Sequence, residues 1–207
     1  VDSASKRQQL HRLSPMGFMP VGQSATSIGR VAISKDGHQM AWTSRNQQGE
    51  RSMPAQLWLQ SRGETPRLIA GKDFLGLPRG DGPLLKSDIS WHKDSDRLIF
   101  GYGKPYVPVK HDSSSTKDER SAVDVWAWTD AVIQPQQAKQ LWREKSRYME
   151  AIYHVNSGVI QALSRKQLPS VVVNTRGNHH WAMRYSQEAY RQRYSWDIQL
   201  PYDVELV

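Results

Sequence analysis

The 207-residue sequence contains no cysteine and no long apolar run. The absence of cysteine excludes disulfide bonds and thiolate metal sites. No segment approaches the roughly 18 consecutive apolar residues of a membrane-spanning helix, so no span is predicted. No glycine-rich loop is followed by the helix and lysine that hold a phosphate group, so the sequence predicts no nucleotide cofactor.

The charge of the chain is strongly positive, because 28 Lys and Arg residues stand against 20 Asp and Glu, a formal net charge of +8. Such a surface can attract nucleic acid or anionic lipid. The basic residues are spread along the chain, with dense segments only at Lys6–Arg12 and Arg143–Arg147. Binding of nucleic acid depends on a basic patch more than on a total, so it is not predicted here.

A strand–turn–strand unit occurs three times. Its clearest copy is Ile89–Phe100 (ISWHKDSDRLIF), with near-copies at Val31–Trp42 (VAISKDGHQMAW) and Val171–Ala182 (VVVNTRGNHHWA). Apolar residues alternate with polar ones on each side of a polar turn, the pattern of half-buried strands joined by a hairpin. The first two copies align without a gap, apolar positions on apolar positions. A one-residue shift would invert the faces of a strand, so this agreement is informative.

The third copy matches less well. In a gapless alignment, His180 falls where Met40 and Leu98 stand in the other copies. A slip of one residue that brings Trp181 to the inner face is an open alternative.

Further short strands extend each unit. Gln56–Leu59 and Pro66–Ala70 follow the first copy, Met149–Val155 and Val159–Leu163 follow the second, and Leu200–Val207 follows the third. Four antiparallel strands in about forty residues make one propeller blade. The sequence therefore predicts an all-β protein, a partial β-propeller of about three to four four-stranded antiparallel blades with one short helical insertion.

The predicted organisation is an extended N-terminal arm over residues 1–27, with a contribution of an edge strand left open, and a partial propeller over 28–207. The blades are expected at about 28–70, at 86–163 with insertions at 101–122 and 129–147, and at 169–207, the last one incomplete. Three blades are fewer than the four to eight of a closed propeller. We therefore expect unpaired edges and apolar end faces, completed by further sequence or by another chain.

No residue is predicted to be catalytic, cofactor-binding or metal-binding. Adjacent residues of a strand point to opposite faces, so His179 and His180 cannot easily share a metal. Asp36, Asp94 and Asp96 lie at the hairpin turns, where aspartate is favoured because it hydrogen-bonds to its own backbone. The sequence therefore assigns these carboxylates to turns and not to acid–base catalysis.

The segment Val123–Gln137 (VDVWAWTDAVIQPQQ) resembles a motif in the N-terminal propeller of prolyl oligopeptidase family serine peptidases, in the bacterial type with a D-[IV]-W-x-W-x-D…Q-x-Q segment. Tyr153–Val155 and Tyr190–Asp197 resemble the same family. The resemblance covers roughly residues 28–207. It implies that a longer parent protein is a serine peptidase whose α/β-hydrolase domain carries a Ser-Asp-His triad.

That resemblance further implies a periplasmic or secreted protein whose propeller gates and positions peptide substrates. The hydrolase domain is not in this chain, and its G-x-S-x-G motif is not found, since residues 22–26 (GQSAT) lack the last glycine. No triad residue is therefore assigned. The alternative function is a non-catalytic propeller module that binds protein partners. A hydrolase domain downstream, or another chain that completes the propeller, is the expected partner.

Limited proteolysis tests the predicted loop at His111–Ser121 (HDSSSTKDERS). We expect the first cut in this polar, low-complexity segment, because such composition favours a mobile surface loop. Mass spectrometry of the first fragments locates the cut. A first cut within Ile89–Phe100 would contradict the blade assignment.

Overall fold

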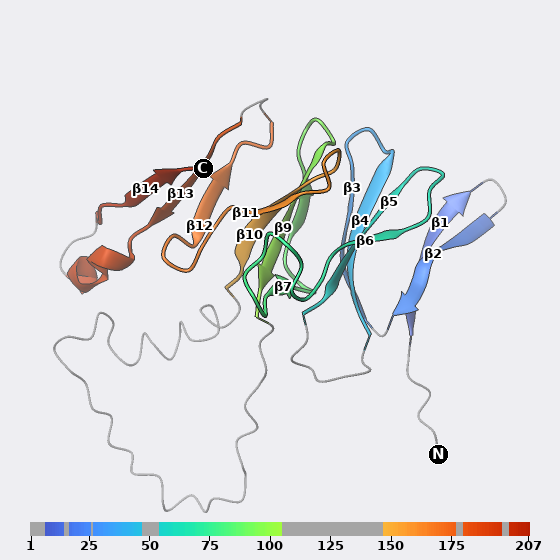
Figure 1. The fold of residues 1–207 in the computed structure, drawn as a ribbon, viewed down its shortest axis with the longest axis horizontal. Helices are drawn as coiled ribbons and strands as arrows, with labels where there is room; N and C mark the ends of the chain where they lie inside the picture. Colours follow the sequence, from blue (N-terminus) through green and yellow to red (C-terminus); the bar gives the residue numbers. More distant parts are fainter. Residues whose placement is uncertain are drawn as a thin grey trace, which may run out of the picture.

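The computed structural model describes residues 7–14, 17–25, 27–46, 54–104, 147–176, 180–195 and 199–207. The loop predicted at His111–Ser121 lies outside the described residues, and so does the insertion at 129–147, except for Arg147. Figure 1 shows strands grouped into sheets that stand side by side. No helix among the described residues is long and apolar enough to cross a membrane.

The strands of the described part follow one another along the chain as β1 (Gln8–Ser14), β2 (Gly17–Ala25), β3 (Ser27–Ile33), β4 (Gln39–Arg45), β5 (Gln56–Ser61), β6 (Arg67–Ala70), β7 (Gly82–Pro83), β8 (Ile89–Trp91), β9 (Arg97–Gly103), β10 (Met149–His154), β11 (Ile160–Ala162), β12 (Ser170–Val173), β13 (Ala182–Ser186) and β14 (Asp203–Leu206).

The first sheet contains four antiparallel strands in chain order, β3-β4-β5-β6. The turn between β3 and β4 uses the predicted Asp-Gly pair. The carboxylate of Asp36 accepts hydrogen bonds from the Ser34 hydroxyl at 2.5 Å and from the His38 backbone N–H at 3.0 Å. Gly37 has a φ of 71°, a conformation that is easy only for glycine. The hairpin predicted for the first copy of the repeat is confirmed.

The second sheet repeats this arrangement with β8, β9, β10 and β11, while the short β7 also pairs with β9. Its hairpin has the same register as the first one. Ile89 pairs with Phe100, as Val31 pairs with Trp42 in the first sheet. Likewise, Trp91 pairs with Leu98, as Ile33 pairs with Met40. The gapless alignment of the first two copies therefore reflects an identical pairing of strands.

The third sheet is formed by β12, β13 and β14. Here Val173 pairs with Ala182, two residues beyond the His180 of the gapless alignment. Ala182 is buried, whereas Trp181 is 69% exposed. The suggested one-residue slip with Trp181 inside is therefore wrong. A shift of two residues preserves the face of the strand, since side chains alternate with a period of two.

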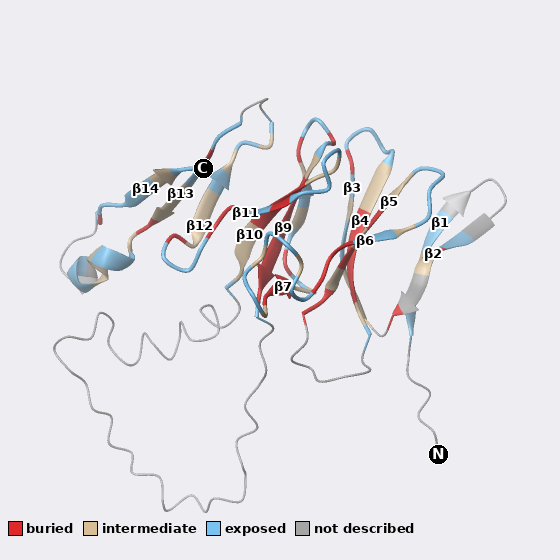
Figure 2. Ribbon diagram, in the orientation of Figure 1, coloured by how far each residue is buried: buried red, intermediate tan, exposed pale blue. Residues whose placement is uncertain are grey.

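Side chains between the sheets form the core. A cluster that includes Leu57 and Leu59 of β5 joins Phe100 and Tyr102 of β9, so the first two sheets pack face to face. The opposite face of the second sheet packs on the third sheet through a smaller cluster. Its buried members are Ile99, Ile152, Leu163 and Ala182. The half-buried side chains of Val171 and Val173 pack against this cluster. In Figure 2 the buried residues concentrate in the first two sheets.

These sheets define the fold class. Each is an antiparallel meander, consecutive sheets stand side by side, and facing sheets share a core. This is the architecture of consecutive propeller blades. The prediction of an all-β, partial β-propeller is confirmed.

The segment predicted to be an extended arm contains a hairpin, formed by β1 and β2. The hairpin lies over Trp42 of the first sheet: a Cβ atom at Gly22 would come within 2.9 Å of the Trp42 ring, and Gly22 has a φ of 66°. Trp42 also stacks on Trp58, with ring centroids 6.4 Å apart. Val21 and Ala25 of the hairpin are buried. In the sequence, Pro15, Gly17, Pro20 and Gly22 interrupt the apolar alternation and obscured the strand pattern.

Replacing a core side chain tests the face-to-face packing. Phe100→Ala removes a ring that is 1% exposed between two sheets. We expect a loss of about 3–5 kcal/mol in the free energy of unfolding, because a cavity remains. Leu75→Ala, at a position that is 95% exposed, is the control, with an expected change within about 0.5 kcal/mol. Urea unfolding followed by tryptophan fluorescence measures both, and equal effects would contradict the core assignment.

Candidate functional site

The outer face of the third sheet is an exposed apolar surface. Val172, Met183 and Leu206 are direct cross-strand neighbours in one row. Val204 lies two residues from Leu206 and so projects from the same face. Their exposed fractions are 50%, 38%, 66% and 57%. We call these four residues the end face.

The end face contrasts with the other side of the same sheet. There, Val171, Val173 and Ala182 pack against the second sheet. The third sheet therefore carries apolar side chains on both faces, and only one face is covered by described residues. Tyr185, which pairs with Val204, extends the end face and meets Tyr202 edge-on at 5.6 Å between ring centroids. Contiguous apolar surface of this kind marks an interaction site.

Ion pairs on the inner side hold β14 in place. Glu205 binds the guanidinium groups of Arg165 at 2.6 Å and Arg184 at 3.2 Å. Arg165 follows β11 of the second sheet, so this carboxylate ties the two sheets together. Two backbone hydrogen bonds between Ala182 and Val207 extend the pairing of β13 with the end of the chain. The strand that carries Val204 and Leu206 is therefore well anchored.

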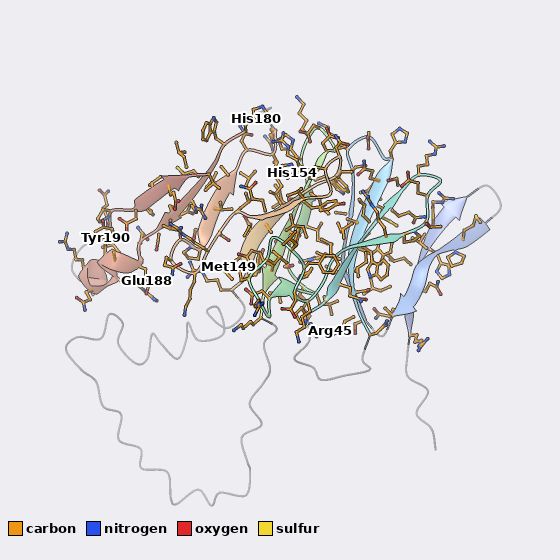
Figure 3. All side chains as sticks on the ribbon, in the orientation of Figure 1. Arg45, Met149, His154, His180, Glu188 and Tyr190 are labelled. Atoms are coloured by element: carbon orange, nitrogen blue, oxygen red, sulfur yellow. The ribbon has the colours of Figure 1, made fainter. Side chains whose placement is uncertain are left out.

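The 3₁₀ helix η2 (Glu188–Ser195) supports the start of β14. The hydroxyl of Tyr190 donates a hydrogen bond to Asp203 at 2.8 Å, and this bond to a carboxylate raises the pKa of the Tyr190 phenol. Arg191 pairs with Glu188 at 3.1 Å within the helix. Figure 3 labels Glu188 and Tyr190 at one end of the third sheet and His180 near the opposite end.

The outer edge of the third sheet is a second feature of the site. The first two sheets each continue to an outer strand, β6 or β11, whereas the described part of the third sheet ends at β14. An edge strand presents N–H and C=O groups that can pair with another strand. The apolar end face and this edge lie on the same strand. An added strand could pair with the edge, and a following sheet could pack on the face.

A buried histidine joins the second and third sheets. His92, 2% exposed, follows β8. Its Nδ1 lies 2.8 Å from the carboxylate of Asp94, and its Nε2 lies 3.2 Å from the carbonyl oxygen of Asn174, beyond β12. Arg97 Nε donates to the Asp94 carboxylate at 3.0 Å. Beside this group, the Lys93 N–H donates to the carbonyl of Thr175, so the turn is a direct contact between the sheets.

Electrostatics in this turn favour the ionised carboxylate of Asp94. Partial burial raises its pKa, but hydrogen bonds from Arg97, His92 and the Asp96 backbone outweigh burial and lower the pKa to about 2. The prediction that Asp94 is a turn former is confirmed, since its Oδ1 accepts the N–H of Asp96 at 3.0 Å.

The other residues considered from the sequence do not come together. Asp36 lies in the turn of the first sheet, His180 is exposed beside the third, and His179 lies outside the described residues. Ser24 lies in β2. Within the described ranges, no group of three His, Asp or Glu residues is placed to hold a metal ion.

Sequence reasoning predicted apolar ends in general but not the residues of the end face. The third strand pair is shifted by two residues, and that shift decides which side chains face outward. It also missed His92, since a single histidine next to a polar turn is ordinarily exposed. The signal in the sequence was the repeat itself. His92 follows Trp91 in the second copy as Ser34 follows Ile33 in the first, and Ser34 is also buried.

The fold and this surface define a partial β-propeller. Searches of protein-family models and of curated proteins give no match. Among solved structures, the chain is similar to a protein provisionally named TolB from Agrobacterium tumefaciens, with 17% identity over 96% of this chain and a TM-score of 0.40. The chain spans half the length of that protein.

Two further solved structures are similar. A provisionally named conserved lipoprotein from Clostridium novyi NT has 8% identity, with 100% of this chain and 98% of that one covered, and a TM-score of 0.42. A puromycin-hydrolysing peptidase from Mycobacterium tuberculosis has 11% identity over 92% of this chain and 29% of its own, with a TM-score of 0.30. All three likenesses are distant, and the fold is assigned here from sheet topology.

Lowering the pH tests the role of Asp94. The pKa of Asp94 in the folded protein is about 2, below the ordinary 3.8. The ionised carboxylate therefore stabilises the folded protein fully above about pH 4, and this contribution is lost as the pH falls toward 2. The Asp94 side chain is 28% exposed, so solvent screening reduces the effect. We expect Asp94→Asn to lower the free energy of unfolding by about 1–2 kcal/mol at pH 7, and by progressively less below pH 4.

The matched control is Asp96→Asn in the same turn, whose effect should stay within about 0.5 kcal/mol. Urea unfolding between pH 2.5 and 7 gives both profiles. Parallel profiles for Asp94→Asn and the unmodified chain would contradict this assignment.

Proposed function

We propose that this chain forms part of the propeller domain of a serine peptidase of the prolyl oligopeptidase family. In this proposal the propeller gates and positions peptide substrates for an α/β-hydrolase domain that is not in this chain. The chemistry would belong to that domain, and the described sheets would supply walls and docking surface.

The observation that carries the proposal is the end face. Val172, Met183, Val204 and Leu206 expose apolar side chains on the face by which a following blade would pack. The second sheet uses the equivalent face to bury Ile99 and Ile152 against the third. The Val123–Gln137 segment, which resembles the bacterial peptidases, supports the choice of family, although it lies outside the described residues.

A non-catalytic propeller module is the second candidate. The end face favours it equally, because a partner protein could cover the same apolar residues. The coding sequence after the codon for Val207 distinguishes the two. A G-x-S-x-G motif between an expected strand and helix favours the peptidase. Further four-stranded repeats up to a stop codon favour the binding module.

A fluorophosphonate probe tests where catalysis resides. We expect no labelled serine in the 207-residue chain, because no complete triad is found in its sequence. We expect one labelled serine, downstream of Val207, when the full coding sequence is expressed. Labelling of a serine within residues 1–207 would contradict the proposed division of roles. An unlabelled full-length protein would contradict the peptidase assignment.

A further inference from the structure

A groove lies between the N-terminal hairpin and the first sheet, on the opposite side of the molecule from the end face. Its volume is about 620 Å³, within the range of roughly 300–1,000 Å³ typical of ligand sites. The lining residues come from β1, from the ends of β3, β4 and β5, and from the turns that follow β3 and β5. We call it the basic groove; it is lined by His11, Arg12, Ile33, Gly37, His38, Gln39, Met40, Gln60, Ser61 and Arg62.

The floor of the basic groove is the face of the first sheet that looks toward the hairpin. Ile33, Met40 and Gln60 form one cross-strand row. They lie on the same face as Trp42, which the hairpin covers at Gly22. The hairpin covers the row of Trp42 but not the end of the sheet, so Ile33 is 65% exposed. The floor therefore offers apolar contact beside the amide of Gln60.

The walls of the groove carry two arginines and two histidines. Arg12 and His11 line it from the hairpin, and Arg62 and His38 line it from the two turns of the first sheet. None of the lining residues is acidic. Arg12 and Arg62 form no ion pair with any residue of the described part. The carboxylate of Asp36 lies in the same β3–β4 turn, next to the lining residue Gly37, but it does not line the groove and already accepts hydrogen bonds from Ser34 and His38.

We propose that the basic groove binds an extended acidic peptide segment in which carboxylate side chains alternate with apolar ones. Carboxylates would pair with Arg12 and Arg62, since an arginine guanidinium binds a carboxylate through two parallel hydrogen bonds. Apolar side chains between them would cover Ile33 and Met40. An extended chain places alternate residues on opposite sides, so one segment can satisfy both the walls and the floor. This site is independent of the proposed peptidase function.

Isothermal titration of the full 207-residue chain with a capped Glu-Leu-Glu-Leu-Glu peptide tests the proposal. We expect binding that weakens by about tenfold or more when the three glutamates become glutamines, because charge-assisted hydrogen bonds are lost. The double variant Arg12→Gln/Arg62→Gln should weaken binding of the acidic peptide by a similar factor. Ile33→Ser should weaken it about threefold or more, through the lost apolar contact.

The control variant is Arg79→Gln, which removes one positive charge, against two in the double variant, and lies in an exposed loop outside the groove lining. It should leave the affinity within about twofold. Each substituted side chain is exposed, and circular dichroism verifies that each variant keeps its fold. Equal weakening by Arg79→Gln, or no effect of the Arg12→Gln/Arg62→Gln pair, would overturn the proposal. Tighter binding of a ten-nucleotide oligothymidylate would also overturn it, in favour of a nucleic-acid site.

Discussion

The structure depends on the burial of one sheet face against another. Between the first two sheets, Leu57, Leu59 and Phe100 are almost completely removed from water. Tyr102 lies among them and donates its hydroxyl to the Ser164 carbonyl at 2.8 Å, while burial raises the pKa of its phenol to about 12. A buried phenol that keeps a hydrogen-bond partner adds apolar area without leaving a polar group unsatisfied.

Hydrogen bonds at the rim of this interface fix the orientation of the second sheet relative to the first. The indole N–H of Trp91, in the second sheet, donates to the carbonyl of Ala32 in the first at 3.2 Å. The hydroxyl of Thr43 donates to the carbonyl of Leu85 at 3.0 Å. Such bonds are directional, whereas apolar burial is not. Trp91 and Tyr102 each combine a packed ring with a polar group that finds a hydrogen-bond partner in this part of the structure.

The same positions of the repeat face the preceding unit in each sheet. Phe100 of the second sheet looks toward the first, and Ala182 of the third looks toward the second. The equivalent row of the first sheet looks toward the N-terminal hairpin, which covers only part of it. The end face and the basic groove therefore arise from one cause: a stack of sheets presents an unmatched surface at each end.

Much of the fold could be predicted from local pattern. Alternation and turn residues located the hairpins at Val31–Trp42 and Ile89–Phe100 with the correct pairing, because Asp36 and Asp94 fix the turns through their own backbone. The third hairpin was misaligned because eight residues separate its paired residues Val173 and Ala182, whereas six separate the equivalent pairs of the first two copies. Alternation cannot detect a shift that preserves the face of the strand.

The surfaces were harder to predict than the strands. The N-terminal hairpin was missed because proline and glycine interrupt its alternation, and its position is set by contact with Trp42, not by local sequence. The basic groove follows from that contact, since Arg12 and Arg62 are distant in the chain and only the docked hairpin brings both to one groove. Likewise, the burial of His92 depends on Asn174 in the next sheet.

The stacking of the three sheets has a direct test in nuclear Overhauser measurements on selectively methyl-labelled protein. The structure predicts cross-peaks from the Leu57 and Leu59 methyl groups to the rings of Phe100 and Tyr102. It also predicts cross-peaks from the Ile99 and Ile152 methyl groups to those of Val171 and Val173. Cross-peaks confined to strands of the same sheet would show that the sheets do not pack face to face, and would contradict the propeller architecture.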